Sequence, residues 1–268
     1  MAFQILKPEI TNISKAVLDA IKYQWQFWAI LLVTFIVSFG LVIWIGFSEM
    51  VFAPFLAVIL YVTAVRHKII SSFWKRFAEI NGWAYEYYGS TEQEQGVMFR
   101  QGEDRNISHI ITGNIDDRRF RIFSYNFSIG SGKRKKTYYY IVFAFRFNGA
   151  FPHIYLNNKH NSYSISAGET IPLPVEFEKN FSLSAPRKYE IEALAIFTPD
   201  VLVGLLDNGF AYDVEFVNQE VLIFTDGQIN DFGGLERAFD QALKLEDLLD
   251  EKLDRFKFQQ IGDMPHTL

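Results

Sequence analysis

Two long apolar runs near the N-terminus constrain this chain more than any other feature. Residues 27–47 are almost wholly apolar, and a second uncharged run covers residues 50–65. The first run has the length of about 20 residues that a helix needs to cross a hydrocarbon core of about 30 Å. A signal peptide has a shorter apolar region with a cleavage site after it, and a soluble protein would need a very large core around two such helices. The sequence therefore predicts a transmembrane helical hairpin.

The charges beside these runs predict their orientation. The short connection between them carries no Lys or Arg, only Glu49. The basic residues on the other sides of the runs are Lys15, Lys22, Arg66, Lys68, Lys75 and Arg76. Because Lys and Arg gather on the cytoplasmic side of a membrane, we expect a multi-pass protein of the cell (inner) membrane with both termini in the cytoplasm.

The rest of the chain divides around this hairpin. Residues 9–24 have apolar residues at helical spacing, which indicates an amphipathic helix that either lies in the membrane interface or packs on the soluble domain. Helical spacing also continues past the second run to Asn81-Gly82, a typical helix end. The predicted organisation is an amphipathic N-terminal helix at 1–24, a transmembrane helical hairpin at 25–66, a juxtamembrane helix extension at 67–82, a cytosolic α+β domain at 83–257 and a disordered tail at 258–268.

Periodicity predicts the class of the cytosolic domain. Segments with a period of two fill most of residues 83–156, and helical periods return after residue 187. A run of strands followed by helices, a hairpin and a last helix is typical of an α+β domain. We therefore expect an antiparallel β-sheet with packed C-terminal helices.

Two details of this sheet are also predicted. In residues 118–129, Phe120 and Ile122 share one face of the strand, while Phe123 and the apolar residues after it share the other. Strict alternation cannot place both sets in one core, so we expect a bulge or strong bend near Ile122–Phe123. Residues 212–225 are expected to form a hairpin about Asn218-Gln219.

Composition excludes several classes of function. The 268-residue chain has a formal net charge of −5, whereas a general nucleic-acid binder needs a basic face to neutralise phosphates. Nucleic acid is therefore not an expected partner. The chain has no cysteine, which excludes disulfides, thiol catalysis and zinc–thiolate sites.

A glycine-rich basic stretch, residues 130–136, is the main candidate contact site. A phosphate-binding loop would need a glycine five residues before the Gly-Lys pair and Ser or Thr after the lysine, but Phe127 and Arg134 occupy those places. We instead predict an exposed hairpin tip that contacts anionic lipid headgroups or a protein partner. The residues expected to make this contact are Lys133, Arg134, Lys135 and Lys136. The alternative is a solvated tip whose charges discourage edge pairing.

No other pattern in the sequence indicates chemistry. The five histidines do not follow a metal-ligand spacing, and residues 226–231 lack the spacing and the closing Glu of a calcium loop. The chain contains no Gly-x-Ser-x-Gly elbow. The sequence therefore names no catalytic residue, no cofactor-binding residue and no metal ligand, and no cofactor is expected.

Several stretches resemble one family of proteins. They are the Gly130–Lys133 tip with the aromatic strand after it, Phe151–Leu156, Phe177–Phe181, the Glu190–Pro199 helix, and the terminal hairpin with its helix. Together, from Phe73 to Leu245, they are similar to uncharacterised bacterial membrane-anchored proteins in which a transmembrane helix pair precedes a cytoplasmic α+β domain. The resemblance implies this architecture and brings no activity with it.

Three hypotheses for function follow. The first is a membrane-tethered cytosolic interaction module without enzymatic activity, favoured because no catalytic set is recognisable. The second is sensing of an anionic membrane surface through the basic tip at 133–136. The third is an enzyme acting on a membrane-derived substrate, which requires a concave pocket with clustered acid–base groups.

Overall fold

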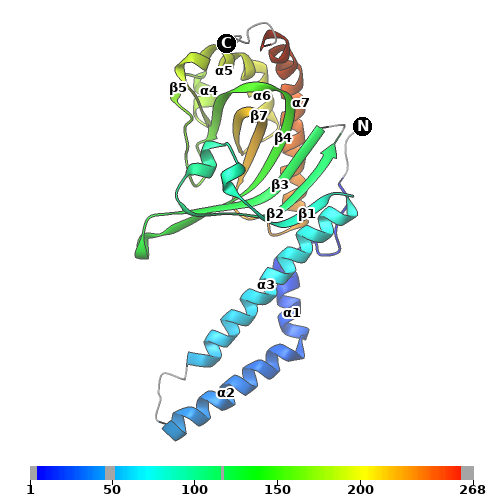
Figure 1. The fold of residues 1–268 in the computed structure, drawn as a ribbon, viewed down its shortest axis with the longest axis vertical. Coiled ribbons are helices and arrows are strands. Elements are labelled where there is room, and N and C mark those ends of the chain that lie inside the picture. Colours follow the sequence, from blue (N-terminus) through cyan, green and yellow to red (C-terminus); the bar gives the residue numbers. More distant parts are fainter. Residues whose placement is uncertain (1–4, 46–51, 116–117, 261–268) are drawn as a thin grey trace, which may run out of the picture.

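A computed structural model describes residues 5–45, 52–115 and 118–260 of the chain. It consists of a sheet domain and of apolar helices that extend from one end of that domain (Figure 1). The N-terminal helices are α1 Ile13–Tyr23, α2 Trp25–Ile45 and α3 Ala53–Ile80. The strands are β1 Ala84–Gly89, β2 Glu103–Ile115, β3 Arg118–Ile129, β4 Lys136–Asn158, β5 Glu169–Ile171, β6 Phe181–Ala185 and β7 Asp213–Asp226. The other helices are η2 Thr91–Gln93, η3 Val97–Arg100, η4 Gly132–Arg134, α4 Val175–Glu178, η5 Arg187–Tyr189, α5 Glu190–Ile196, α6 Pro199–Asp207 and α7 Phe232–Gln260.

The two apolar runs form α2 and the first half of α3. Most side chains of α2 are exposed although they are apolar, and Phe27 packs on Tyr61 of α3 with 5.3 Å between ring centroids. The first half of α3 is equally exposed, whereas its second half buries Phe73, Trp74 and Phe77 in the core of the sheet domain. One uninterrupted helix therefore belongs to both parts of the molecule.

Helix α1 packs on the sheet domain. Its residues Ile13 and Val17 are buried in the same core as the second half of α3. The backbone N–H of Ile13 donates to the carbonyl of Asn230 over 2.9 Å, and the N–H of Phe232 donates to the carbonyl of Thr11 over 2.9 Å. The segment therefore packs mainly on α3, and its first turns join the core of the sheet domain.

The strands form an antiparallel sheet in the order β1-β2-β3-β4-β6-β5, and β7 also pairs with β4. Strand β4 is the centre of this arrangement because its 23 residues pair with β3, β6 and β7. Helix α7 lies along one face of the sheet (Figure 1) and buries Leu235, Phe239 and Leu245 against it. The predicted α+β class, with two apolar N-terminal helices, an antiparallel sheet and packed C-terminal helices, is confirmed.

The sheet has a hydrophobic core on each face. Phe120 and Ile122 of β3 belong to the core beneath α3 and α7, whereas Phe123, Tyr125 and Phe127 belong to a second core on the opposite face. Strict alternation therefore holds along β3, which pairs with β4 in unbroken register. The expected bulge in β3 is wrong because the expectation assumed a single core. The irregularity at this level lies in the partner strand β2, whose register shifts between Ser108 and Ile111 opposite Phe123.

Strand β7 also differs from the expectation. It runs without reversal through Asn218, which adopts φ +52°, and pairs with β4 on both sides of that residue. The register of this pairing shifts between Arg146 and Ile154 of β4. Asn enters the left-handed region more readily than most residues, so here it bends two long paired strands instead of closing a hairpin. The predicted hairpin about Asn218-Gln219 is wrong.

Candidate functional site

The four basic residues singled out in the sequence lie together at the tip between β3 and β4. The tip contains η4, and Lys133, Arg134, Lys135 and Lys136 are all exposed. Gly130 and Gly132 have φ of +86° and +56°, a conformation that glycine adopts at no steric cost. The turn therefore depends on the two glycines that precede the basic cluster.

The basic side chains of the tip are not equivalent. Lys135 forms an ion pair with Asp104 of β2, which raises the pKa of the Lys135 ammonium. The ammonium of Lys136 lies 4.5 Å from the ring centroid of Tyr138, within the range of a cation–π contact. Lys133 and Arg134 have no ion-pair partner among the described residues, so their charges are available to a ligand.

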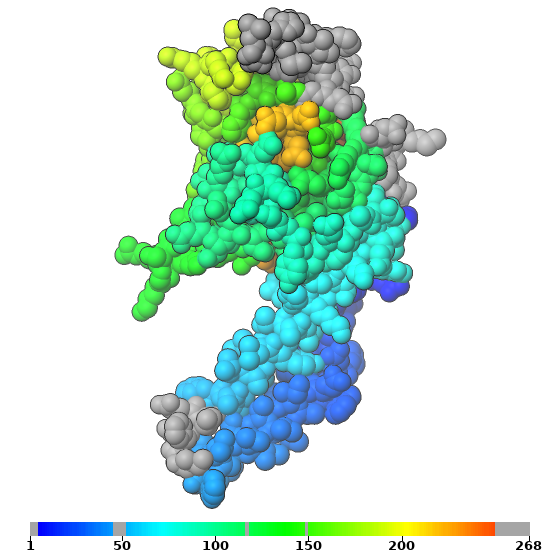
Figure 2. All heavy atoms as spheres, in the orientation of Figure 1, coloured from blue at the N-terminus to red at the C-terminus, as the bar shows by residue number. Residues whose placement is uncertain are grey.

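The position of the tip relative to the apolar helices is its main structural feature. Figure 1 shows that the β3–β4 hairpin extends from the sheet at the end of the domain from which α2 and α3 leave. In the space-filling view the tip forms a separate protrusion beside these helices (Figure 2). A membrane containing α2 and α3 would therefore face the tip.

A second exposed feature is an arginine-lined hollow of about 550 Å³ near the bend of β4 and β7. It opens where β7 and the segment before β2 reach the surface (Figure 2). Arg121 is fixed there by Glu94, at 2.6 and 3.0 Å, and by Glu220, at 3.1 Å. Arg119 and Arg146 line the same hollow, so its cationic groups outnumber these two carboxylates.

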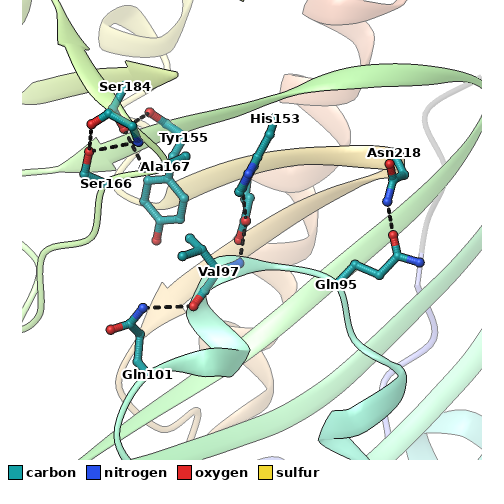
Figure 3. Close-up of polar contacts among 11 residues, drawn as sticks. Gln95, Val97, Gln101, His153, Tyr155, Ser166, Ala167, Ser184 and Asn218 are labelled. Carbon is teal, nitrogen blue, oxygen red and sulfur yellow. Dashed lines mark hydrogen bonds and ion pairs between the residues drawn. The ribbon is translucent and has the colours of Figure 1, made fainter. Parts of the chain in front are cut away.

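A buried polar cluster lies on the same face of the sheet, beneath residues 90–101, which we call the strap. The strap covers the second core, and Figure 3 shows its contacts with β7, beside His153 of β4. Glu215 accepts hydrogen bonds through Oε1 from the Val97 N–H, over 2.6 Å, and from His153 Nε2, at 2.7 Å. Asn218 donates to Gln95 of the strap. These contacts hold the strap against the sheet.

Asp213 holds the loop after β4 in the way that Glu215 holds the strap. Its Oδ1 accepts hydrogen bonds from the Asn158 N–H, over 2.6 Å, and from Asn161 Nδ2, over 2.9 Å. Burial raises the pKa of the Asp213 carboxyl to about 7. Burial also raises the pKa of Tyr155, and the charge of the neighbouring Asp213 raises it further.

These acid–base groups bear on the hypothesis of an enzyme. Asp213 and Glu215 are completely buried. Neither of them lines the arginine-lined hollow. Asp213 Oδ1 and Glu215 Oε1 accept hydrogen bonds from backbone and side-chain donors of the protein itself. The arrangement can hold the strap and the loop in place, and it offers no open surface for a substrate.

Sequence patterns did not predict this buried cluster. Asp213 and Glu215 alternate with Val214 and Phe216, which is the pattern of a strand with one solvated face. The signal that the face is covered lies elsewhere, in the apolar Met98 and Phe99 of the strap, which are buried in the second core. Within the described residues, no group of three or more His, Asp or Glu is placed to hold a metal ion.

Comparisons with known proteins complete the description. No protein-family model matches the chain, and no curated protein matches it in sequence. A solved structure that matches is the crystal structure of the mycobacterial trehalose monomycolate transport factor A, TtfA. It is 14% identical, the match covers 67% of this chain and 92% of that chain, and the TM-score is 0.48. At these values the likeness carries no argument about function.

The described residues contain two helices that are long and apolar enough to cross a membrane, at Trp25–Trp44 and Ala53–Ile80. The apolar parts of these helices are almost entirely exposed, unlike the core helices of a soluble protein. This pair of helices suggests membrane association. No family model supports the family that the sequence resembles.

Proposed function

We propose that this protein is a membrane-anchored interaction module whose basic tip rests on anionic lipid headgroups. The observation that carries the proposal is that the tip and the two apolar helices occupy the same end of the sheet domain (Figure 1). Helices α2 and α3 would hold the domain at the membrane, and residues 133–136 would fix its orientation there.

The lengths of the helices support this anchoring. The 21 residues of α2 span about 31 Å at a rise of about 1.5 Å per residue, which matches a hydrocarbon core of about 30 Å. The 28 residues of α3 span about 42 Å by the same rise. The excess of α3 is its second half, which is buried in the sheet domain. The flanking Lys and Arg residues favour both termini on the cytoplasmic side.

The energy available at the tip is modest but sufficient for an orienting contact. A basic residue near an anionic membrane surface contributes about 1 kcal/mol, so Lys133 and Arg134 together contribute about 2 kcal/mol. Because the anchor already holds the tip near the lipid, this contact is intramolecular in effect and needs little affinity of its own.

The chain contains no cysteine, so a single introduced cysteine can report the position of the tip. We expect an environment-sensitive fluorophore on S131C, in full-length protein reconstituted into vesicles containing phosphatidylglycerol, to be quenched by headgroup-attached quenchers. The same label on V203C, in α6 at the opposite end of the domain, is the control. The double substitution K133E/R134E should abolish the difference between the two labels.

Equal quenching at S131C and V203C in anionic vesicles would refute the contact between tip and membrane. Orientation needs a separate measurement in cells. A membrane-impermeant maleimide should label E49C without permeabilisation and S131C only after it. The reverse pattern would show that the domain lies on the other side of the membrane.

A protein partner at the arginine-lined hollow is the second candidate function. The hollow presents Arg119 and Arg146 beside Gln219 on the exposed surface, a set that suits an acidic peptide segment. In-cell crosslinking of the full-length protein should recover such a partner, and R119A/R146A should lose it. Recovery of only lipid or of the protein itself would exclude this candidate.

A further inference from the structure

A small cavity of about 170 Å³ lies in the corner between α3 and the sheet. Its lining residues with polar groups include Arg66, Ser108, His109, Ser124, Tyr125, Asn126, Tyr139, Tyr140, Gln228 and Asn230. Among the residues that the structure describes, no Asp or Glu lines it, although the chain as a whole carries a formal net charge of −5. A cavity with hydroxyl, amide and guanidinium donors and without carboxylates suits an anion.

The sheet supplies the polar floor of this cavity. Along β3, the face that carries Phe120 and Ile122 in the core continues with Ser124 and Asn126, so it becomes polar where it extends past α3. Ser124 pairs with Ser108 of β2. The two hydroxyl groups have no hydrogen-bond partner within the described part of the chain, and both are therefore available as donors.

An irregularity in β2 brings a third group to the same place. The register of β2 shifts between Ser108 and Ile111, and His109 adopts φ +55°. Such irregularities re-aim side chains and occur often beside functional sites. The His109 ring stacks on Trp74 of α3, with 6.3 Å between centroids, and its Nδ1 lies 3.0 Å from Tyr85 Oη.

The protonation state of His109 leaves its ring one N–H to donate. Burial, followed by the charge of His67, lowers the pKa of His109 to about 4. The ring is therefore neutral at pH 7 and carries one N–H. The His109 Nε2 has no hydrogen-bond partner within the described residues.

Arg66 provides the cation at the mouth of the cavity. Its Nη2 donates to Gln228 Oε1 over 3.0 Å, which holds the guanidinium beside the turn between β7 and α7. Arg66 is also the first charged residue after the second apolar run. If α3 crosses the membrane, Arg66 and the cavity lie at the depth of the lipid headgroups.

We propose that this corner cavity binds the phosphate of an anionic phospholipid headgroup, with Arg66 as its cation and Ser108 and Ser124 as hydroxyl donors. The inference rests on the proposed membrane anchoring and adds a specific lipid site to it. The basic tip meets the membrane through surface charge, whereas the cavity would hold one headgroup in a defined place.

Calorimetric titration of the delipidated full-length protein in a zwitterionic detergent tests the proposal. The ligands are short-chain phosphatidylglycerol, short-chain phosphatidylcholine and inorganic phosphate. We expect phosphatidylglycerol to bind at one molecule per chain and more tightly than the other two. Because a hydrogen bond to a charged group contributes about 1.5–3 kcal/mol, R66A should weaken binding by about tenfold or more.

The matched control is K68A, which removes an exposed positive charge from the same level of α3 outside the cavity. K68A should leave the affinity unchanged, and S108V/S124V, which removes both hydroxyls while keeping good strand formers, should weaken binding. Equal losses in R66A and K68A, or equal affinity for the two lipids, would overturn the proposal. Inorganic phosphate binding as tightly as phosphatidylglycerol would assign the site to a soluble phosphate and overturn the lipid assignment.

These outcomes are distinguishable from a failure of the tip. A variant with Lys133, Arg134, Lys135 and Lys136 all changed to Ala should bind short-chain phosphatidylglycerol as the unchanged protein does. Its fluorophore at residue 131 should nevertheless lose the quenching described above. Loss of calorimetric binding in this variant would show that the tip, and not the cavity, holds the lipid.

Discussion

The stability of the sheet domain should depend on pH through Asp213. Its side chain is completely buried, and its Oδ1 accepts hydrogen bonds from Asn158 N–H and Asn161 Nδ2. These two neutral donors lower the pKa, but the loss of water around the carboxylate outweighs them. Burial thus raises the pKa of Asp213 from 3.8 to about 7.

The sign and size of the effect follow from this pKa. Asp213 holds its proton more tightly in the folded protein than in the unfolded chain, so its contribution to stability is fully present below pH 3.8 and is lost as the pH rises through about 7. A shift of one pKa unit corresponds to about 1.4 kcal/mol. The titration of Asp213 alone should therefore lower the free energy of unfolding by about 4 kcal/mol across this window.

Substitution D213N isolates this contribution. The amide keeps the oxygen that accepts from Asn158 and Asn161, but it cannot ionise. We expect the difference in unfolding free energy between D213N and the unchanged protein to move in favour of D213N as the pH rises from 5 to above 7. Denaturant unfolding of the full-length protein in detergent, followed by far-ultraviolet circular dichroism, measures that difference.

Taking the difference between D213N and the unchanged protein removes the contributions of groups that both proteins share. The control is D207N, which removes an exposed carboxylate from α6 and should follow the unchanged protein at every pH. Parallel curves for D213N and the unchanged protein between pH 5 and 8 would refute the reasoning from burial.

Three further outcomes are expected. F77A removes a completely buried ring of α3 and should lower the unfolding free energy by about 3–5 kcal/mol in the same assay; a loss below 1 kcal/mol would mean that α3 is not packed on the sheet. G102A should lower the melting temperature more than G132A. Both glycines have a positive φ, +58° at Gly102 and +56° at Gly132, but a Cβ added at Gly102 would lie 2.3 Å from the Ser128 carbonyl oxygen, whereas one added at Gly132 would lie in open space. Equal losses would contradict this. In NMR titrations, His109 should titrate near pH 4, and a midpoint above 6 would contradict its burial. Protonation of His109 should also lower the free energy of unfolding as the pH falls from 6.5 to 4.

The sequence was sufficient where one pattern decided the outcome. Apolar length identified α2 and α3. Alternation separated Phe120 and Ile122 of β3 from the apolar residues that begin at Phe123, but it did not show that both faces of the strand are covered. The basic residues of the tip were found because a charged stretch that follows two glycines between two strands has few other arrangements. Each of these inferences depends on residues that are neighbours along the chain.

The rest depended on which surfaces are covered, and sequence patterns do not contain that information. Glu215 appeared solvated because its strand alternates, but the strap covers that face and contributes Val97 N–H as a partner. The bend at Asn218 resembled a hairpin turn because nothing local distinguishes a reversal from a kink in a long pair of strands. The cavity beside Arg66 combines α3, three strands and the turn before α7, so no short motif describes it.

The continuity of α3 gives these separate features a common consequence. Because the helix has no break between its exposed apolar half and its buried half, Phe73, Trp74 and Phe77 fix the sheet directly to the apolar helices without a flexible linker. Any tilt of α3 in a membrane would therefore move the basic tip and the mouth of the cavity together. The tip is displaced sideways from α3 (Figure 1), so a small tilt changes its height above the lipid more than that of Arg66, which lies on the helix itself. The tip is accordingly the element suited to respond to the charge of the surface, and the cavity the element suited to hold one headgroup while the domain tilts.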